Sequence, residues 1–164
     1  MKQLITLLVV VSILMGCQTV MIERKWNVGE YKYEGYPLLL RFPIGLDYDA
    51  LSKEYPQLVV ATFEFSEVTS NGLPESNYNK SLEDFDLYLS SRIERDGEGI
   101  TVLIETFSGK RIFYMYSKRE LDLEQLKNKV AAQYPKNHLV WEKQLDSGWK
   151  FIKKYAHDFN FPTT

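Results

Sequence analysis

The chain has 164 residues, of which 45% are hydrophobic and 26% are charged, the length and composition of one globular domain. Twenty basic and twenty-two acidic residues leave a formal net charge of −2, without the basic excess typical of nucleic-acid-binding proteins. One Cys and two His argue against a disulfide framework, a Cys-based zinc site and a Cys–His nucleophile.

The N-terminus has the pattern of a secretion signal. Lys2 is followed by a twelve-residue, mostly apolar run from Leu4 to Met15, which is shorter than the roughly 20 residues that cross a bilayer as a helix. The run ends in Leu14-Met15-Gly16-Cys17, which resembles the lipobox of bacterial lipoproteins. The resemblance implies cleavage before Cys17 and palmitate-type acyl chains on this residue. The alternatives are an ordinary signal peptide with an incidental Cys, or an uncleaved anchor.

This interpretation divides the chain into three parts. Residues 1–16 would be the lipoprotein signal peptide, residues 17–25 the lipidated Cys17 with a short tether, and residues 26–164 a single domain. Membrane lipid would then be a partner through Cys17, because two or three acyl chains anchor a protein stably without a transmembrane helix. If the cell is Gram-negative, Gln18 favours the periplasmic face of the outer membrane over the inner membrane, by resemblance to other lipoproteins.

Periodicity and turn residues predict the elements of the domain. Leu82, Phe85, Leu89 and Ile93 recur at helical spacing after Pro74, a residue suited to begin a helix. Strands are predicted where β-branched and aromatic residues are concentrated between turn residues. In chain order, the predicted elements are strands 26–33 and 37–42, helix 47–55, strand 58–65, helix 74–95, strands 100–106 and 111–116, helix 123–134, strand 138–145 and a C-terminal helix capped by Asp146.

The fold class follows from this order. From strand 58–65 onward the order is β-α-β-β-α-β, which is that of a ferredoxin-like sandwich, an α+β fold with two helices on one face of an antiparallel sheet. An N-terminal hairpin and a C-terminal helix are added to it. We expect the helices to leave the other face of the sheet open.

The domain also resembles a bacterial family known only as domain of unknown function 695. The resemblance covers about residues 26–157 and implies an α+β domain, but it implies no reaction and no catalytic residue. Ser147 departs from the Pro that this family often has there, which affects only the start of a helix. The residues that carry the resemblance are Trp26, Tyr33–Gly35, Pro37, Leu38, Arg41, Tyr55, Asn71–Pro74, Leu82, Glu83, Thr106, Gly109, Phe113–Tyr116, Asp146, Trp149 and Tyr155.

Two charged residues interrupt apolar strands and are candidates for a binding site. Arg41 follows three Leu, and Glu64 lies between two Phe, so each must point to solvent or be paired. They could pair with each other or with Arg111 on the open face of the sheet. A structural ion pair or an edge position is the alternative. The apolar part of such a patch would be Phe113, Met115 and Val140.

Other chemistry has little support in the sequence. His138 and His157 are predicted to be surface residues, so we expect no metal site, and no phosphate-binding, dinucleotide-binding or Gly-x-Ser-x-Gly motif is present. We expect no cofactor. The clustered carboxylates are predicted to lie on solvated helix faces: Glu83, Asp84, Asp86, Asp122 and Glu124.

The function favoured by these observations is a non-catalytic lipoprotein domain that binds an envelope protein or another envelope component. We expect no nucleic-acid partner. The alternatives are an uncharacterised hydrolase that uses acidic and Arg residues, and a toxin-immunity lipoprotein.

Overall fold

The computed structural model describes residues 24–161, in which six strands form one antiparallel sheet. The strand order is β1-β2-β4-β5-β3-β6, so β1 and β6 are its edges. Every neighbouring pair is antiparallel. The strands are β1 (Trp26–Tyr33), β2 (Tyr36–Pro43), β3 (Gln57–Glu64), β4 (Gly99–Phe107), β5 (Lys110–Ser117) and β6 (Leu139–Leu145).

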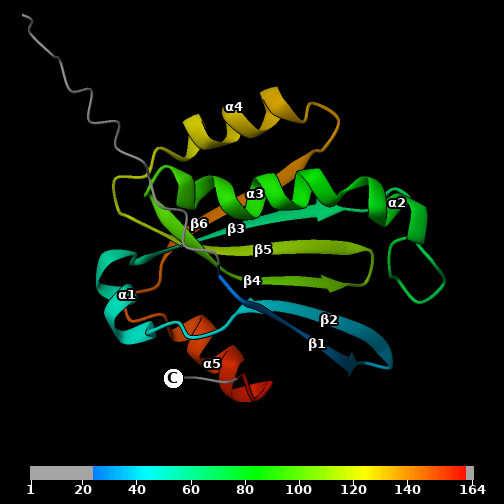
Figure 1. Cartoon of the computed structure of the whole chain (residues 1–164), viewed down its shortest axis with the longest axis horizontal. Helices are drawn as coiled ribbons and strands as arrows, with labels where there is room; N and C mark the ends of the chain where they lie inside the picture. The colour runs from blue at the N-terminus through cyan, green and yellow to red at the C-terminus, as the bar shows by residue number, and fades with distance from the viewer. Residues whose placement is uncertain (1–23, 162–164) are drawn as a thin grey trace, which may run out of the picture.

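Helices cover both faces of the sheet. Two of them, α3 and α4, pack on one face, whereas α5 and α1 pack on the other (Figure 1). The helices in the described chain are α1 (Tyr48–Glu54), α2 (Ser76–Ser81), α3 (Glu83–Arg95), α4 (Leu123–Gln133) and α5 (Lys150–Asp158). A mixed α+β domain is therefore confirmed, and the expectation of an open face is wrong.

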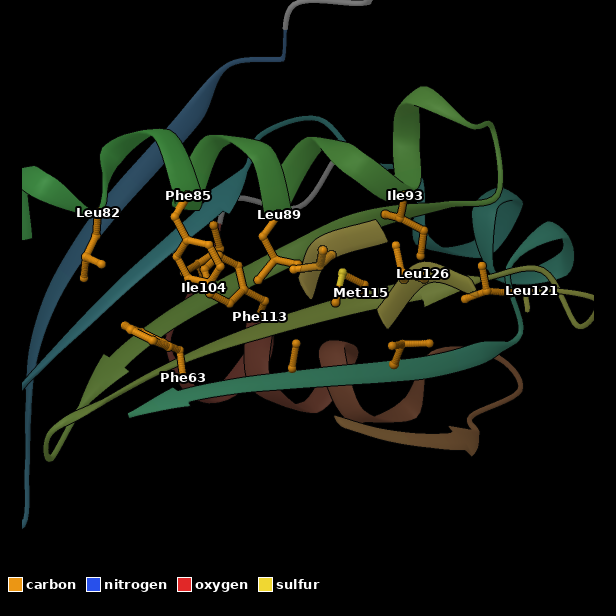
Figure 2. Close-up of a cluster of buried hydrophobic side chains, with 13 residues drawn as sticks. Phe63, Leu82, Phe85, Leu89, Ile93, Ile104, Phe113, Met115, Leu121 and Leu126 are labelled. Atoms are coloured by element: carbon orange, nitrogen blue, oxygen red, sulfur yellow. The ribbon is translucent and has the colours of Figure 1, made fainter. Parts of the chain in front are cut away.

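The core under α3 follows the helical spacing found in the sequence. Figure 2 shows Phe85, Leu89 and Ile93 directed from α3 toward the sheet, where they meet Phe113 and other strand residues. The predicted helix is divided in two, because the Leu82 N–H bonds to the Asn79 carbonyl three residues back at 3.2 Å and closes α2 before α3 begins. Helix α3 nevertheless keeps the expected apolar stripe, and α2 adds the partly buried Tyr78 to the same core.

The second core is built on Trp149 and explains why the other face is not open. Trp149 is fully buried, stacks on Tyr116 with ring centroids 4.2 Å apart, and donates from Nε1 to the Tyr55 carbonyl at 2.7 Å. The helix begins at Lys150, later than predicted, with the Asp146 carboxylate accepting from the Lys150 and Phe151 N–H groups. The apolar side of α5 thus seals this face.

The β1–β2 hairpin extends the sheet beyond β4 and prepares the site. Its two turn residues, Glu34 and Gly35, have φ of 51° and 84°, the positive values that a tight hairpin turn requires. On the α3 side of this hairpin Trp26 and Val28 remain partly exposed, at 38% and 60%. Helix α3 therefore stands beside an uncovered strip of sheet.

Candidate functional site

Arg41 and Arg111 meet at a carboxylate that α3 supplies. Their strands lie on either side of β4 and pair with it in antiparallel register, with Arg41 opposite Ile104 and Arg111 opposite Thr106. Arg41 Nη2 donates to Asp86 Oδ2 at 3.0 Å, and Arg111 Nη1 donates to the same oxygen. Three segments distant in sequence thus form one buried charge cluster.

Arg111 is held on every side and serves the fold. Its Nε donates to Thr106 Oγ1 at 3.1 Å, and its Nη2 donates to Asn79 Oδ1 at 2.8 Å. The guanidinium also lies over the Phe65 ring, 5.1 Å from its centroid. With only 5% of the residue exposed, Arg111 has little capacity left for a ligand.

Arg41 and Asp86, in contrast, keep unused hydrogen-bonding groups. The Arg41 side chain is 36% exposed, and its one side-chain hydrogen bond within the described chain is to Asp86. Burial lowers the pKa of Arg41, and the Arg111 charge adds to this effect while the Asp86 charge opposes it. Asp86 Oδ1 is buried and has no hydrogen-bond partner among the described residues, a condition that costs about 1–3 kcal/mol for an acceptor.

A cavity of about 260 Å³ opens beside these groups, and we call it the Arg41 cavity. Its polar lining combines Arg41, Asp86 and Glu83, whose carboxylate forms no ion pair with another residue of the described chain. The apolar lining includes Leu87, which is 63% exposed. The complete lining is Trp26, Arg41, Glu83, Asp86, Leu87, Ser90 and Ile104.

A second cavity, of about 420 Å³, lies farther along the same strand. Pro37 and Leu39 line it from β2, four and two positions from Arg41, so they share the face of the strand that Arg41 occupies. Leu73 closes it from the loop before α2, where the Gly109 N–H bonds to the Gly72 carbonyl at 2.8 Å. An ideal Cβ at Gly72 would lie 3.0 Å from Ser108 Cα, so this close approach favours glycine.

Comparison with known protein families identifies the family of the chain. Residues 24–155 match DUF695, a family of unknown function. The chain belongs to this family. No curated protein and no solved structure matched it. The resemblance noted in the sequence is therefore confirmed for the DUF695 domain, whereas lipoprotein status stays a prediction.

Asp86 is the site residue that sequence reasoning missed. It is 8% exposed, so the prediction that it lies on a solvated helix face is wrong, although Glu83 and Asp84 of the DUF695 domain are exposed as expected. The signal was its position four residues after Leu82 and three before Leu89, on the edge of the apolar stripe. A carboxylate there must be paired, and Arg111 pairs it.

Glu64 does not join the two arginines. It is exposed and forms an ion pair with Lys110, the residue opposite it on β5, at 3.0 Å. Of the three predicted apolar neighbours, Phe113 and Met115 are fully buried in the core under α3, whereas Val140 is exposed on the edge strand β6. The predicted patch therefore does not form one surface: Glu64, the two core residues and Val140 each lie apart from the two arginines.

The other candidate groups lie apart from this cavity. His157 is exposed and its Nδ1 lies 3.4 Å from Asp158, while His138 precedes β6 and lines a separate cavity beside α4. Within residues 24–161 there is no group of three or more His, Cys, Asp or Glu residues that could hold a metal ion. No helix of this part is long and apolar enough to span a membrane. Cys17 lies outside the described residues.

Proposed function

We propose that this DUF695 protein is a lipid-anchored, non-catalytic binding domain of the cell envelope and that it holds its ligand in the Arg41 cavity. The observation that carries the proposal is the incomplete pairing of a buried charge cluster at the wall of an open cavity. A cluster that served only stability would be expected to satisfy its own acceptors.

Exposed apolar side chains support the same surface. Trp26 and Leu87 line the Arg41 cavity from two elements, β1 and α3, and both are partly exposed. A large apolar side chain beside polar groups of fixed position is the usual composition of a binding site. The hydrolase and toxin-immunity hypotheses stay predictions.

A photo-crosslinking experiment tests where the protein binds. A photoreactive amino acid at Leu87 should capture an envelope component, because this side chain borders the cavity. The matched control is the same substitution at Val140, which is equally exposed, at 62% against 63%, but lies on β6 at the edge of the sheet. Equal capture from both positions, or capture from neither, would contradict the proposed site.

Anchoring is the second part of the proposal and rests on the sequence of the N-terminus. Residues 18–25 would tether the domain to an acylated Cys17, and eight extended residues reach at most about 26–29 Å. The cavity would then work close to the membrane surface, on the periplasmic face of the outer membrane if the cell is Gram-negative.

Intact mass and membrane fractionation test this anchor directly. The native protein should have a mature mass that begins at Cys17 and includes acyl chains, and it should sediment with membranes. The Cys17→Ala variant should lose both properties. An unmodified native chain in the soluble fraction would remove the lipoprotein hypothesis.

We also propose that β3 to β6, with α3 and α4, form a ferredoxin-like unit. Support comes from the order β4-β5-β3-β6, from antiparallel pairing throughout, and from the location of both helices on one face. The β1–β2 hairpin and α5 would be additions to this unit. A crystal structure with a different strand order would contradict the assignment.

A further inference from the structure

We infer that the Arg41 cavity binds a zwitterion of amino-acid size with an apolar side chain, its carboxylate on Arg41 and its ammonium group on Glu83. This inference rests on the proposed binding function and specifies its ligand class. It is argued from the size, the charges and the unpaired groups of the cavity.

The size limits the ligand first. At about 260 Å³ the Arg41 cavity falls just below the range of roughly 300–1,000 Å³ that is usual for pockets of drug-sized ligands. Its apolar lining of Trp26, Leu87 and Ile104 comes from three different elements, β1, α3 and β4. A small ligand with one aliphatic or aromatic side chain could therefore contact apolar groups on three sides.

The charges of the cavity then select a dipolar ligand. Arg41 and Arg111 contribute two positive charges, and Asp86 and Glu83 contribute two negative charges, so the cluster is neutral as a whole. A simple anion attracted to Arg41 would also meet the two carboxylates, and a simple cation would meet the guanidinium. A ligand that carries both charges complements each group, which is how electrostatic complementarity gives specificity.

The unpaired hydrogen-bonding groups fit the two ends of such a ligand. Arg41 Nε and Nη1 make no hydrogen bond to another described residue, and a guanidinium prefers a carboxylate as its planar acceptor. At the other end, an ammonium group supplies three donors for the Glu83 carboxylate, which lines the cavity, is exposed and forms no ion pair with another described residue.

Calorimetric titration of the full-length protein in detergent tests the assignment with three probes. L-leucine carries both charges, L-leucinamide lacks the carboxylate, and N-acetyl-L-leucine lacks the ammonium group. We expect L-leucine to bind and each capped analogue to bind about tenfold to a hundredfold more weakly, since a hydrogen bond to a charged group contributes about 1.5–3 kcal/mol.

Two variants assign each charge to its partner. Arg41→Met should lower the affinity for L-leucine to that for L-leucinamide and should leave the affinity for L-leucinamide unchanged. Glu83→Gln should lower the affinity for L-leucine to that for N-acetyl-L-leucine and should leave the affinity for N-acetyl-L-leucine unchanged. The matched control is Arg92→Met. Arg92 lies on α3, the helix that carries Glu83, and pairs with Asp96 at 2.8 Å outside the cavity. This control should bind L-leucine as the native protein does.

Failure of the ligand class can be told apart from failure of the binding function. If L-leucine does not bind at millimolar concentration, or if the capped analogues bind equally well, the zwitterion assignment is overturned. Site-specific crosslinking at Leu87 would in that case still support a ligand of another class. Loss of both signals would overturn the proposed function as well.

Discussion

The two faces of the sheet bury polar groups in opposite ways. On the α5 face, the Tyr155 hydroxyl donates to Glu105 at 2.5 Å and the Tyr116 hydroxyl donates to Asp146 at 2.5 Å, so each buried polar group has a partner from another element. On the α3 face, Asp86 keeps a buried oxygen and Arg41 keeps donors that have no partner among the described residues. Aromatic packing seals the first face, whereas a cavity opens at the second.

This difference teaches that burial of a charge does not by itself mark a site. Glu105 and Asp86 are both partly or fully buried acidic residues. Burial raises the pKa of Glu105, whereas hydrogen bonds from the Tyr155 and Tyr114 hydroxyls stabilise its carboxylate. Asp86 instead shares one oxygen between two arginines. The useful distinction is between polar groups that the fold satisfies and polar groups that it leaves open.

The largest expected effect is on the sealed face. Trp149→Ala should lower the free energy of unfolding by about 3–5 kcal/mol, because it leaves a large cavity and an unpaired Tyr55 carbonyl. Denaturant unfolding measures this loss. Trp26→Ala, on the α3 face, is the matched comparison and should cost less than about 1 kcal/mol. Equal losses would mean that the two faces do not differ as described.

Arg111→Met should be nearly as costly, although Arg111 lies on the α3 face. Removing this guanidinium leaves Asn79 Oδ1 without its donor and the buried Asp86 carboxylate with Arg41 as its one remaining ion-pair partner in the described chain, and breaking a buried ion pair costs about 3 kcal/mol or more. Chemical denaturation would report it. Adding Asp86→Leu should recover part of the lost unfolding free energy. No recovery would show that the Asp86 carboxylate is not the group that the loss of Arg111 destabilises.

Arg41→Met separates binding from stability. Because the Arg41 side chain is 36% exposed and solvent screens its ion pair, the variant should lose less than about 1 kcal/mol of unfolding free energy. It should nevertheless lose crosslinking from a photoreactive residue at position 87, when stability and crosslinking are measured in the same preparation. A loss of stability as large as that of Arg111→Met would assign Arg41 to the fold.

The smallest effect concerns pH on the sealed face. A raised pKa for Glu105 means that, above its ordinary value of 4.5, the unfolded chain releases a proton that the folded chain keeps. Stability should therefore fall as pH rises from 4.5 through the folded-state pKa. Glu105→Gln should remove this pH dependence. As pH rises through the same range, the unfolding free energy of the variant should therefore increase relative to that of the native protein. A constant difference would contradict the pKa shift.

Local patterns in the sequence predicted most of the elements. The apolar stripe of α3 is present, and so are the strands predicted at 26–33, 37–42, 100–106 and 111–116 and the helix predicted at 123–134. These features depend on contacts within a few residues of each other, which is why they could be predicted. The break at Leu82 and the late start of α5 depend on packing, and the sequence did not predict them.

For the site, the sequence by itself determined that Arg41, a charged residue in an apolar strand, must point to solvent or be paired, and it named Arg111 as a neighbour of the same candidate site. It did not identify the partner, since Asp86 lies in another element and only the position of α3 above the sheet brings its carboxylate to both arginines. Nor did it predict the cover provided by α5, because a helix with an apolar side does not specify which face it will bury. Strand pairing and helix packing decided both, through contacts between residues distant in sequence.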